Sequence, residues 1–411
     1  MKKITILTSG QPSANPRMVK AAIALSADGY KIKVLYCPLS PWADTFDEQL
    51  FRAHPQIEWI KVGYHPLRQK SLYRYARLRQ IFYRSLYRFS GDLNDAAIRS
   101  LVLFSQELVQ QVKKHAADLF IGHNLGALPA VVRAAKWHQA KAAFDFEDFH
   151  RGEDTKASLH WKLTKQTEEK YIPGLDFATA ASPLIASAYQ ALFPTLPVIT
   201  VNNCFPSAYA GTEQIELPGK PLKLFWFSQF IGLNRGLETV IEAIGKMEKG
   251  AVVLSLLGNC TDLMKNYFKT VAKENGLQDT QLNFIPPVEE KDIIKIAASH
   301  HIGLACEVPH IPNRDICLTN KIFMYILAGN ALVCTNTKAQ SRFMHEYPGT
   351  GFVYEQHDAV QLASILKKYS SEPLLLQQHR VAAKKLGIEK LNWENEQIIL
   401  LQKIKAVFES K

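Results

Sequence analysis

The sequence lacks the cysteine patterns of metal centres and disulfide frameworks. Its six cysteines are scattered, no two of them form a Cys-x-x-Cys pair, and no histidines stand at metal-binding spacing. Most of these cysteines lie among apolar residues, as buried thiols do. A structural zinc site is therefore not expected, and a reducing, cytoplasmic location is favoured.

Long apolar segments are missing as well. The longest uncharged run, residues 177–212, is interrupted by four prolines. The more apolar run at 322–337 is too short to cross a bilayer. The first ten residues read as a strand, because their apolar stretch is shorter than a signal peptide requires. We therefore expect a soluble protein, or one bound peripherally to the inner face of the cell membrane.

Two nucleotide-binding motifs are also absent. No Gly-x-Gly-x-x-Gly follows the first predicted strand of either half of the chain, and no P-loop pattern occurs. These motifs place phosphates at a helix start in dinucleotide-dependent dehydrogenases and P-loop kinases. Both classes are therefore disfavoured.

Acidic residues are scarce between residues 61 and 100, where nine lysines and arginines accompany only Asp92 and Asp95. A helix predicted over 67–89 separates this charge from apolar side chains. One face carries Leu72, Tyr75, Leu78, Phe82, Leu86 and Phe89. The opposite face carries Lys70, Arg74, Arg77, Arg84 and Arg88, while Arg79 falls on the apolar side. Basic amphipathic helices of this kind bind anionic membrane surfaces.

Two other interpretations of this helix remain open. Its apolar face can pack on its own domain while the arginines are solvated. Nucleic-acid binding is a weaker interpretation, because no nucleic-acid-binding motif accompanies the charge. We therefore expect an anionic membrane surface as a partner, and no nucleic acid.

At 411 residues the chain is long enough for two or three domains. Strand and helix patterns alternate in both halves, which predicts parallel sheets covered by helices on both faces. We predict an α/β fold of two doubly wound, Rossmann-like domains facing a central cleft. The expected domains are 1–206 and 222–390, joined by a polar linker at 207–221. A C-terminal helix at 391–411 follows, with the option of packing back on the first domain.

The run Ile316–Val333 predicts a loop, a capped helix and a buried strand in immediate succession. Thr319 suits the N-cap, and Gly329 suits the helix end. The amides of residues 320–322 would then be free, with Lys321 in the first turn. Such a helix start attracts anions, so a phosphate or diphosphate is the expected ligand. An ordinary strand–helix connection is the alternative.

A dense group of titratable residues lies in the sequence FDFEDFHRGE, residues 144–153, which holds four carboxylates and a histidine. Asp145 and Glu147 alternate on one face of the strand predicted here, and His123 ends the preceding predicted strand. Such clusters are frequent in functional sites, although each residue taken singly can be a satisfied polar group.

Several stretches resemble glycosyltransferases of the GT-B fold, in particular family 4 and its relatives (group 1 type). The likeness is specific in the second half, where five stretches come in the order of the nucleotide-sugar-binding domain. These are FWFSQFIGLNRGLE (225–238), LSLLG (254–258), FIPPV (284–288), IGLAC (302–306) and LTNK (318–321). In the first half, SANPR (13–17) and DLFIGHN (118–124) are similar more loosely.

The resemblance implies a donor site in the second half. Arg235 would neutralise the donor diphosphate, and Lys321 with the amides of Thr319 and Asn320 would hold it from the other side. Fixed cations stabilise the charge that develops on a nucleoside-diphosphate leaving group, so we expect neither a cofactor nor a metal. The other implied donor-binding residues are Ser228, Gly236, Gly258, Ile285, Val288, Asp315 and Leu318.

The sequence departs from family 4 at its paired glutamates. These stand eight positions apart in the family, and the corresponding residues here are Ile316 and Met324. Asp315 and Glu307 are the available substitutes. The contact to the donor ribose is left unexplained, and the choice between retention and inversion of the anomeric configuration stays open.

The implied function is transfer of a sugar from a nucleotide sugar, and a UDP-sugar or GDP-sugar is the expected donor. The acceptor would be a hydroxyl of a polysaccharide or lipid-linked saccharide at the cytoplasmic membrane face. Asp145 or Glu147 would act as general base, and His123 would contact the sugar. A non-catalytic GT-B scaffold or nucleotide-sugar-binding protein is one alternative, suggested by Ile316 and Met324. A sugar-nucleotide epimerase, which shares this architecture, is another.

Overall fold

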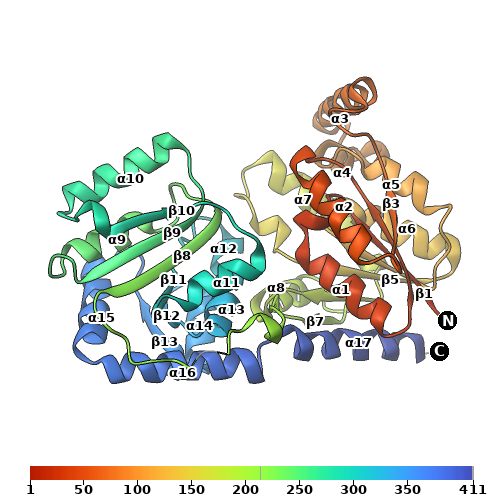
Figure 1. Cartoon of the computed structure of the whole chain (residues 1–411). Coiled ribbons are helices and arrows are strands. Elements are labelled where there is room, and N and C mark those ends of the chain that lie inside the picture. The colour runs from red at the N-terminus through yellow and green to blue at the C-terminus, as the bar shows by residue number, and fades with distance from the viewer. Residues whose placement is uncertain (213, 410–411) are drawn as a thin grey trace. The chain divides into compact units, whose positions relative to one another are not determined.

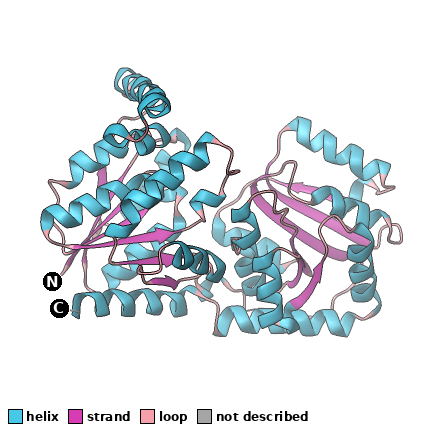
Figure 2. Cartoon of the chain, turned by 180° about the vertical axis from the view of Figure 1, so that it is seen from behind, coloured by secondary structure: helices cyan, strands magenta, loops and turns pink. Residues whose placement is uncertain are grey.

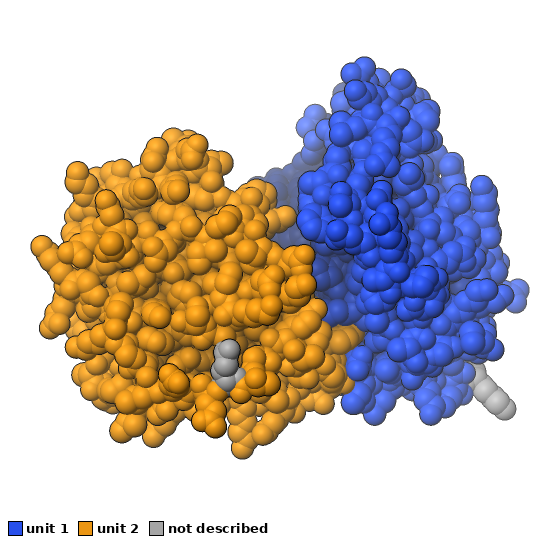
Figure 3. All heavy atoms as spheres, viewed as in Figure 1, with its two compact units in different colours: residues 1–202, 311–313, 397–411 blue, residues 203–310, 314–396 orange. Residues whose placement is uncertain are grey.

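The computed structural model describes residues 1–212 and 214–409, which divide into two compact units (Figures 1 and 3). Unit 1 consists of residues 1–202, 311–313 and 397–409, and unit 2 consists of residues 203–310 and 314–396 apart from 213. Residue 213 of the predicted linker and residues 410–411 of the predicted last helix lie outside the described residues.

Unit 1 is built on a seven-stranded parallel sheet with the order β3-β2-β1-β4-β5-β6-β7. Its strands are β1 (Lys3–Thr8), β2 (Lys31–Tyr36), β3 (Glu58–Lys61), β4 (Leu119–His123), β5 (Lys141–Phe146), β6 (Phe177–Ala180) and β7 (Val198–Thr200). The order reverses between β1 and β4, where Thr8 and His123 pair in register. Ligands of doubly wound sheets bind at such a switch point, beyond the carboxyl ends of the strands.

Helices lie against this sheet (Figure 2). They are α1 (Pro16–Ala27), α2 (Asp44–Ala53), α3 (Lys70–Ser90), α4 (Ala96–Leu101), α5 (Ser105–Val112), α6 (Leu128–His138), α7 (Leu159–Tyr171) and α8 (Pro183–Leu192). All five residues of β4 are buried, which is the pattern of a strand covered on both faces.

Unit 2 is built on a six-stranded parallel sheet with the order β10-β9-β8-β11-β12-β13. Its strands are β8 (Leu222–Phe230), β9 (Val252–Asn259), β10 (Leu282–Ile285), β11 (Ile302–Ala305), β12 (Ala331–Thr335) and β13 (Gly351–Tyr354). Here the order reverses between β8 and β11. The second sheet therefore has its own switch point.

The remaining helices follow in chain order. They are α9 (Leu237–Gly245), α10 (Asp262–Glu274), α11 (Glu290–Ala298), α12 (Pro312–Ile316), α13 (Asn320–Ala328), α14 (Lys338–Glu346), α15 (Ala359–Ser371), α16 (Pro373–Glu389) and α17 (Trp393–Glu409). The part of α17 from residue 397 packs within unit 1, where the ring of Phe408 lies 5.8 Å from that of Tyr30.

The predicted fold class of two doubly wound α/β units is confirmed, and most predicted elements are present. The pattern gave no prediction for α2, β3, α8, α12, α14 and β13. Val102 adopts an extended conformation and separates α4 from α5. This break lets Phe104 turn into the core, where it is 1% exposed.

Helix α3 contacts unit 1 through Arg79, on its apolar side, and through a side between its two predicted faces. Gln80 donates hydrogen bonds to the carbonyls of Ser100 and Leu101, each at 3.1 Å. Arg79, the residue that did not fit the apolar face, pairs with Glu107 of α5 at 2.6 Å. Arg79 and the side of the helix that carries the buried Ala76 therefore attach it to the unit.

The apolar face of α3 is open to solvent. Leu72, Tyr75, Leu78, Phe82 and Phe89 are between 46% and 89% exposed. Leu86, the sixth residue of this face, is half-buried, so the interpretation that the face packs on its own domain is wrong for the other five residues. Figure 1 shows α3 at the margin of unit 1, beside α4. Within the described residues, no helix combines the length and the apolar composition needed to span a membrane.

The Arg79–Glu107 ion pair allows the attachment of α3 to unit 1 to be tested. Arg79→Ala should lower the free energy of unfolding by about 1–3 kcal/mol, because it leaves a half-buried carboxylate without its partner. Arg77→Ala is the matched control on the same helix, since Arg77 is exposed and bonds only to Gln80. Urea denaturation of both variants measures the difference. Equal losses would show that the ion pair does not hold α3.

Candidate functional site

In unit 1, the three predicted catalytic residues meet at the carboxyl ends of neighbouring strands. His123 ends β4 and pairs in register with Asp145 of β5, and Glu147 directly follows β5. The Nδ1 atom of His123 lies 3.4 Å from a carboxylate oxygen of Asp145 and 2.9 Å from one of Glu147. We call these three residues the unit 1 cluster.

Asp145 is fully engaged by its neighbours. Arg17 of α1 forms two parallel hydrogen bonds with it, from Nε at 2.6 Å and from Nη2 at 2.8 Å. The hydroxyl of Thr179 donates a third. Although burial raises it, Arg17 and His123 hold the pKa of Asp145 well below its usual value. We infer that Asp145 organises the cluster, because its occupied oxygens leave no room for a proton from a substrate.

Glu147 keeps more access to solvent than Asp145, with 18% of its side chain exposed against 4%. It accepts hydrogen bonds from Asn15 at 2.5 Å and from Asn124 at 3.0 Å. These two asparagines belong to the SANPR and DLFIGHN stretches, so both converge on one carboxylate. Glu147 is therefore the better-placed proton acceptor of the cluster.

The unit 1 cluster is also a geometric candidate for a metal, because one ligand atom from each residue lies within 4.8 Å of the others. Burial lowers the pKa of His123, but the hydrogen bonds to Asp145 and Glu147 outweigh this effect and raise the pKa to about 9. A metal would therefore have to displace a proton from the imidazole. A cation would also have to displace Arg17 from Asp145.

In unit 2, three cationic side chains surround one buried carboxylate at the switch point between β8 and β11. Glu307, two residues beyond β11, accepts hydrogen bonds from Lys321 at 2.7 Å and from Arg314 at 3.0 Å. Burial raises the pKa of Glu307, but Lys321, Arg314 and Arg235 together hold it below its usual value. We call these four residues the unit 2 cluster. Three cations and one carboxylate give this cluster a net positive formal charge.

Arg235 and the start of α13 carry the features of an anion site. Within the described part of the chain, the guanidinium of Arg235 has no ion pair, and burial and the like charge of Arg314 lower its pKa. The hydroxyl of Thr319, at the N-cap of α13, is buried and has no hydrogen-bond partner among the described residues. A surplus of positive charge beside a helix start attracts phosphate.

Two predicted glycines shape the backbone beside the unit 2 cluster. Gly236 has φ 74°, and a Cβ atom on it would lie 2.4 Å from the carbonyl oxygen of Cys306. Gly258 has φ 151°, and a Cβ atom there would lie 2.2 Å from the carbonyl oxygen of Ser228. Glycine is therefore required where these loops pass the ends of the neighbouring strands.

Helix α13 begins and ends as predicted, from the N-cap Thr319 to Gly329 in the left-handed conformation. The prediction that three amides are free is wrong for Ile322, whose N–H bonds to the carbonyl of Thr319 at 3.2 Å. The side chain of Lys321 is nearly buried, and its ammonium lies 5.4 Å above the ring of Trp226. Its charge is shared between Glu307 and any anion bound there.

Other predicted donor-site residues are placed differently. Asp315 is paired with Lys338 of α14, to the backbone N–H at 2.9 Å and to Nζ at 2.8 Å. Met324 is 1% exposed in the core, so a carboxylate at that position would be buried. Ser228, Ile285 and Ile316 are half-buried, Leu318 is buried, Val288 is exposed, and Asn320 is exposed and bonded to Asn203 at 2.8 Å.

Sequence reasoning missed Arg17 and Arg314 as site residues. Arg17 stood in a stretch that resembles the family, yet nothing local indicated that it would reach a carboxylate 128 positions away. Arg314 lies seven positions after Glu307, in a loop whose course the sequence pattern does not define. Arg17 lies in one of the stretches that resemble the family, so a search of these stretches for cations would have found it. Arg314 lies outside them.

Comparison with known proteins supports the fold. No family model matches the sequence, and no curated protein matches it. HepE from Anabaena, solved with UDP and with UDP-glucose, superposes with a TM-score of 0.70 at 14% identity, covering 99% of this chain and 100% of that one. Sucrose-phosphate synthase from Thermosynechococcus elongatus superposes with a TM-score of 0.73 at 13% identity, covering 100% of both chains.

A third similar structure is a TarM variant from S. aureus in complex with fondaparinux, α-GlcNAc-glycerol and UDP. It superposes with a TM-score of 0.67 at 10% identity, covering 98% of this chain and 99% of that one. At these identities the likeness shows the fold and not the activity. The chain has the GT-B fold that the resemblance predicted.

The raised pKa of His123 predicts a pH-dependent stability. The imidazolium is stabilised in the folded state, so its contribution is complete below about pH 6.5 and is lost as the pH rises to about 9. The difference in unfolding free energy between wild type and His123→Gln should therefore shrink by about 2–4 kcal/mol across that range. Urea denaturation at pH 6, 7.5 and 9 measures it. A constant difference would mean that His123 is neutral in the folded protein.

Proposed function

We propose that this chain is a glycosyltransferase. It would move a sugar from a nucleoside-diphosphate sugar to a hydroxyl of a polysaccharide or lipid-linked acceptor at the cytoplasmic face of the membrane. The observation that carries the proposal is the unit 2 cluster. Its three cations and one carboxylate lie at the switch point of a doubly wound sheet, where such sheets bind their ligands.

The charge of the unit 2 cluster suits a diphosphate. With Glu307 ionised, the formal charge is +2, and a diphosphate carries about two to three negative charges at neutral pH. Because Glu307 already holds Lys321 and Arg314 in place, the cluster needs little reorganisation when the anion arrives. The UDP and UDP-glucose complexes of HepE favour a UDP-sugar as the donor.

The proposed reaction follows from the charge of each cluster. As the bond between C1 of the sugar and the diphosphate oxygen breaks, its electron pair leaves with the nucleoside diphosphate, and Arg235 and Arg314 stabilise that charge. The acceptor oxygen forms the new bond to C1 and releases its proton. In an inverting reaction Glu147 would accept this proton, while His123 and the two asparagines hold the carboxylate in place.

A binding protein without turnover is the second candidate. The burial of Met324 and the pairing of Asp315 with Lys338 favour it, because neither Met324 nor the substitute Asp315 offers a free carboxylate to the donor. Such a protein would bind the nucleotide sugar and release it unchanged. A sugar-nucleotide epimerase would instead alter the donor in the absence of any acceptor.

Helix α3 supports the membrane part of the proposal. It contains no acidic residue, and the side chains of Arg74, Arg77, Arg84 and Arg88 are exposed along with its apolar face. An apolar stripe flanked by arginines lies in the interface of an anionic bilayer, where each cation contributes about 1 kcal/mol. Helix α3 would therefore hold the enzyme where lipid-linked acceptors are found.

Donor binding is the first test of the proposed function. We expect UDP or UDP-sugars to stabilise the wild type in a thermal-shift screen that also includes GDP, CDP and dTDP. Arg235→Ala should raise the dissociation constant about 10- to 100-fold, the loss of one charge-assisted contact. Arg342→Ala, an exposed arginine on α14, is the matched control.

Three outcomes separate the candidates. A shift with one base and acceptor-dependent turnover would support the glycosyltransferase. A shift without turnover would favour the binding protein, and conversion of the donor alone would favour the epimerase. The absence of a shift with all four nucleotides would remove the donor site.

Membrane binding is tested on α3 directly. Changing Arg74, Arg77, Arg84 and Arg88 together to Gln should release the protein from vesicles that contain phosphatidylglycerol, because about four cationic contacts are lost. Co-sedimentation measures the bound fraction, and vesicles of phosphatidylcholine alone serve as the uncharged control. Unchanged co-sedimentation of the variant would mean that α3 does not bind the membrane.

A further inference from the structure

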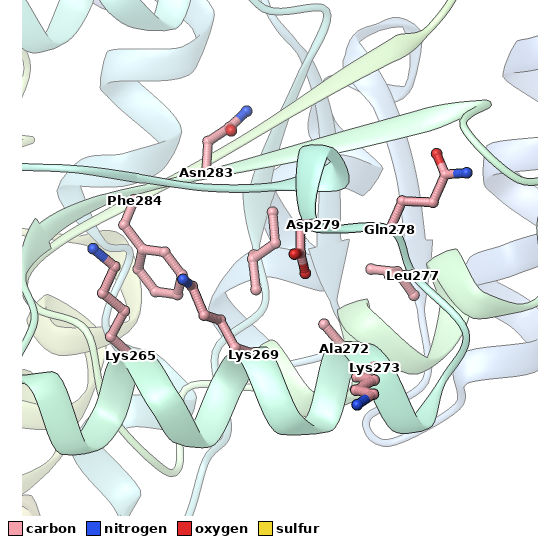
Figure 4. Close-up of a pocket in the computed structure, with 10 residues that line it drawn as sticks. Lys265, Lys269, Ala272, Lys273, Leu277, Gln278, Asp279, Asn283 and Phe284 are labelled. Carbon is pink, nitrogen blue, oxygen red and sulfur yellow. The ribbon is translucent and has the colours of Figure 1, made fainter.

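A cavity of about 230 Å³ lies in unit 2, between α10 and the edge strand β10. It is separate from the unit 2 cluster, since it shares no residue with it. Three lysines of α10 line one side, Lys265, Lys269 and Lys273, and the ring of Phe284 of β10 faces them from the other (Figure 4). Asp279 supplies a single carboxylate. The cavity is therefore positively charged.

The three lysines are spaced at four-residue intervals, so they share one face of α10, about 6 Å apart along its axis. Like charges at this spacing destabilise a helix. Within the described residues, none of the three forms an ion pair. Lysines on other helices of the same unit do pair, as Lys246 does with Glu242 and Lys295 with Asp292. The charges of the three lysines on α10 are therefore available to bind an anion.

The opposite side of the cavity offers an aromatic ring and hydrogen-bonding groups. In Figure 4 the ammonium groups of Lys265 and Lys269 flank the ring of Phe284, and the Lys265 nitrogen lies 5.7 Å from the ring centroid. The exposed side chain of Asn283 points to the other side of β10, away from α10 (Figure 4). Because β10 is the last strand of its sheet, its outer backbone groups have no strand partner among the described residues.

We propose that this cavity binds an acidic saccharide, a chain of sugar rings that carry carboxylates or other anionic groups. The lysine row would pair with the anionic groups, Phe284 would contact the C–H face of a sugar ring, and the strand edge would bond its hydroxyls. The proposal rests on the proposed function, because the saccharide bound here would be part of the acceptor glycan. It adds a second contact to that glycan, away from the reacting hydroxyl.

The shape of the cavity favours a saccharide over two other polyanions. Single-stranded nucleic acids are held by several aromatic rings on which successive bases stack, and this cavity offers only Phe284. A lipid surface is flat and would contact a convex helix face rather than a cavity. Hydroxyl-rich sugar rings fit a small polar recess with one ring, as described above.

The test uses a purified hexasaccharide of galacturonic acid and its methyl ester, which has the same rings without the charge. Isothermal titration should detect the acid form and not the ester. The triple variant Lys265→Ala, Lys269→Ala, Lys273→Ala should weaken binding about 10- to 100-fold, the sum of three exposed ion pairs. A control triple variant at Lys246, Lys249 and Lys295 removes the same charge from other surfaces of unit 2.

Each outcome decides the proposal. Selective loss in the α10 variant, with the UDP-induced thermal shift intact, supports it. Equal loss in both triple variants would show non-specific attraction, and no binding of the hexasaccharide would overturn the site. Tighter binding of a dT₁₂ oligonucleotide or of phosphatidylglycerol vesicles through the same lysines would assign it to another polyanion. Because binding is measured directly, failure of donor binding would leave this result interpretable.

Discussion

The buried ion pair between Arg17 and Asp145 is the interaction on which the first unit depends. It joins the start of α1 to the end of β5, and Arg17 also donates to the carbonyl of Val201 at 2.6 Å. Taking two charges out of water is costly, and a buried pair is tolerated only when its geometry is good and its remaining groups are bonded. Here both carboxylate oxygens and three guanidinium nitrogens are bonded. The fixed Asp145 then orients His123.

The two clusters show opposite uses of charge at equivalent places in two similar sheets. In the unit 1 cluster, the cations Arg17 and protonated His123 balance the carboxylates Asp145 and Glu147. In the unit 2 cluster, Glu307 balances only part of the charge around it. A balanced cluster holds side chains in position, whereas an unbalanced one favours the arrival of an anion. The unit 2 cluster is therefore the one whose charge suits an anion.

The sequence predicts the fold well because apolar periodicity is a local property. The alternation of strands and helices, the cap at Thr319 and the stop at Gly329 all follow from neighbouring residues. The elements without a prediction, such as β3 and β13, are four-residue strands with only partial burial, so their pattern is weak. The grouping of His123, Asp145 and Glu147 could also be predicted, because parallel strands end at the same edge.

The partners within the site could not be predicted in the same way. The Arg17–Asp145, Arg314–Glu307 and Asp315–Lys338 pairs depend on how loops cross the ends of strands, which no periodicity records. The amphipathic pattern of α3 predicted an apolar and a basic face, with Arg79 as a misfit on the apolar side. The helix is attached through Arg79, Gln80 and the buried Ala76, and the pattern does not indicate which partners these residues meet.

The arrangement of α17 has a consequence for how the chain folds during synthesis. Residues 397–409 complete unit 1, where Ile404 is fully buried and Phe408 contacts Tyr30. A ribosome adds about 5–20 residues per second, so this segment emerges roughly 10–40 s after residue 202. During that interval Tyr30 and Phe177 lack the contacts that Phe408 and Lys403 later make with them. Unit 2 is therefore synthesised before the last helix that packs in unit 1.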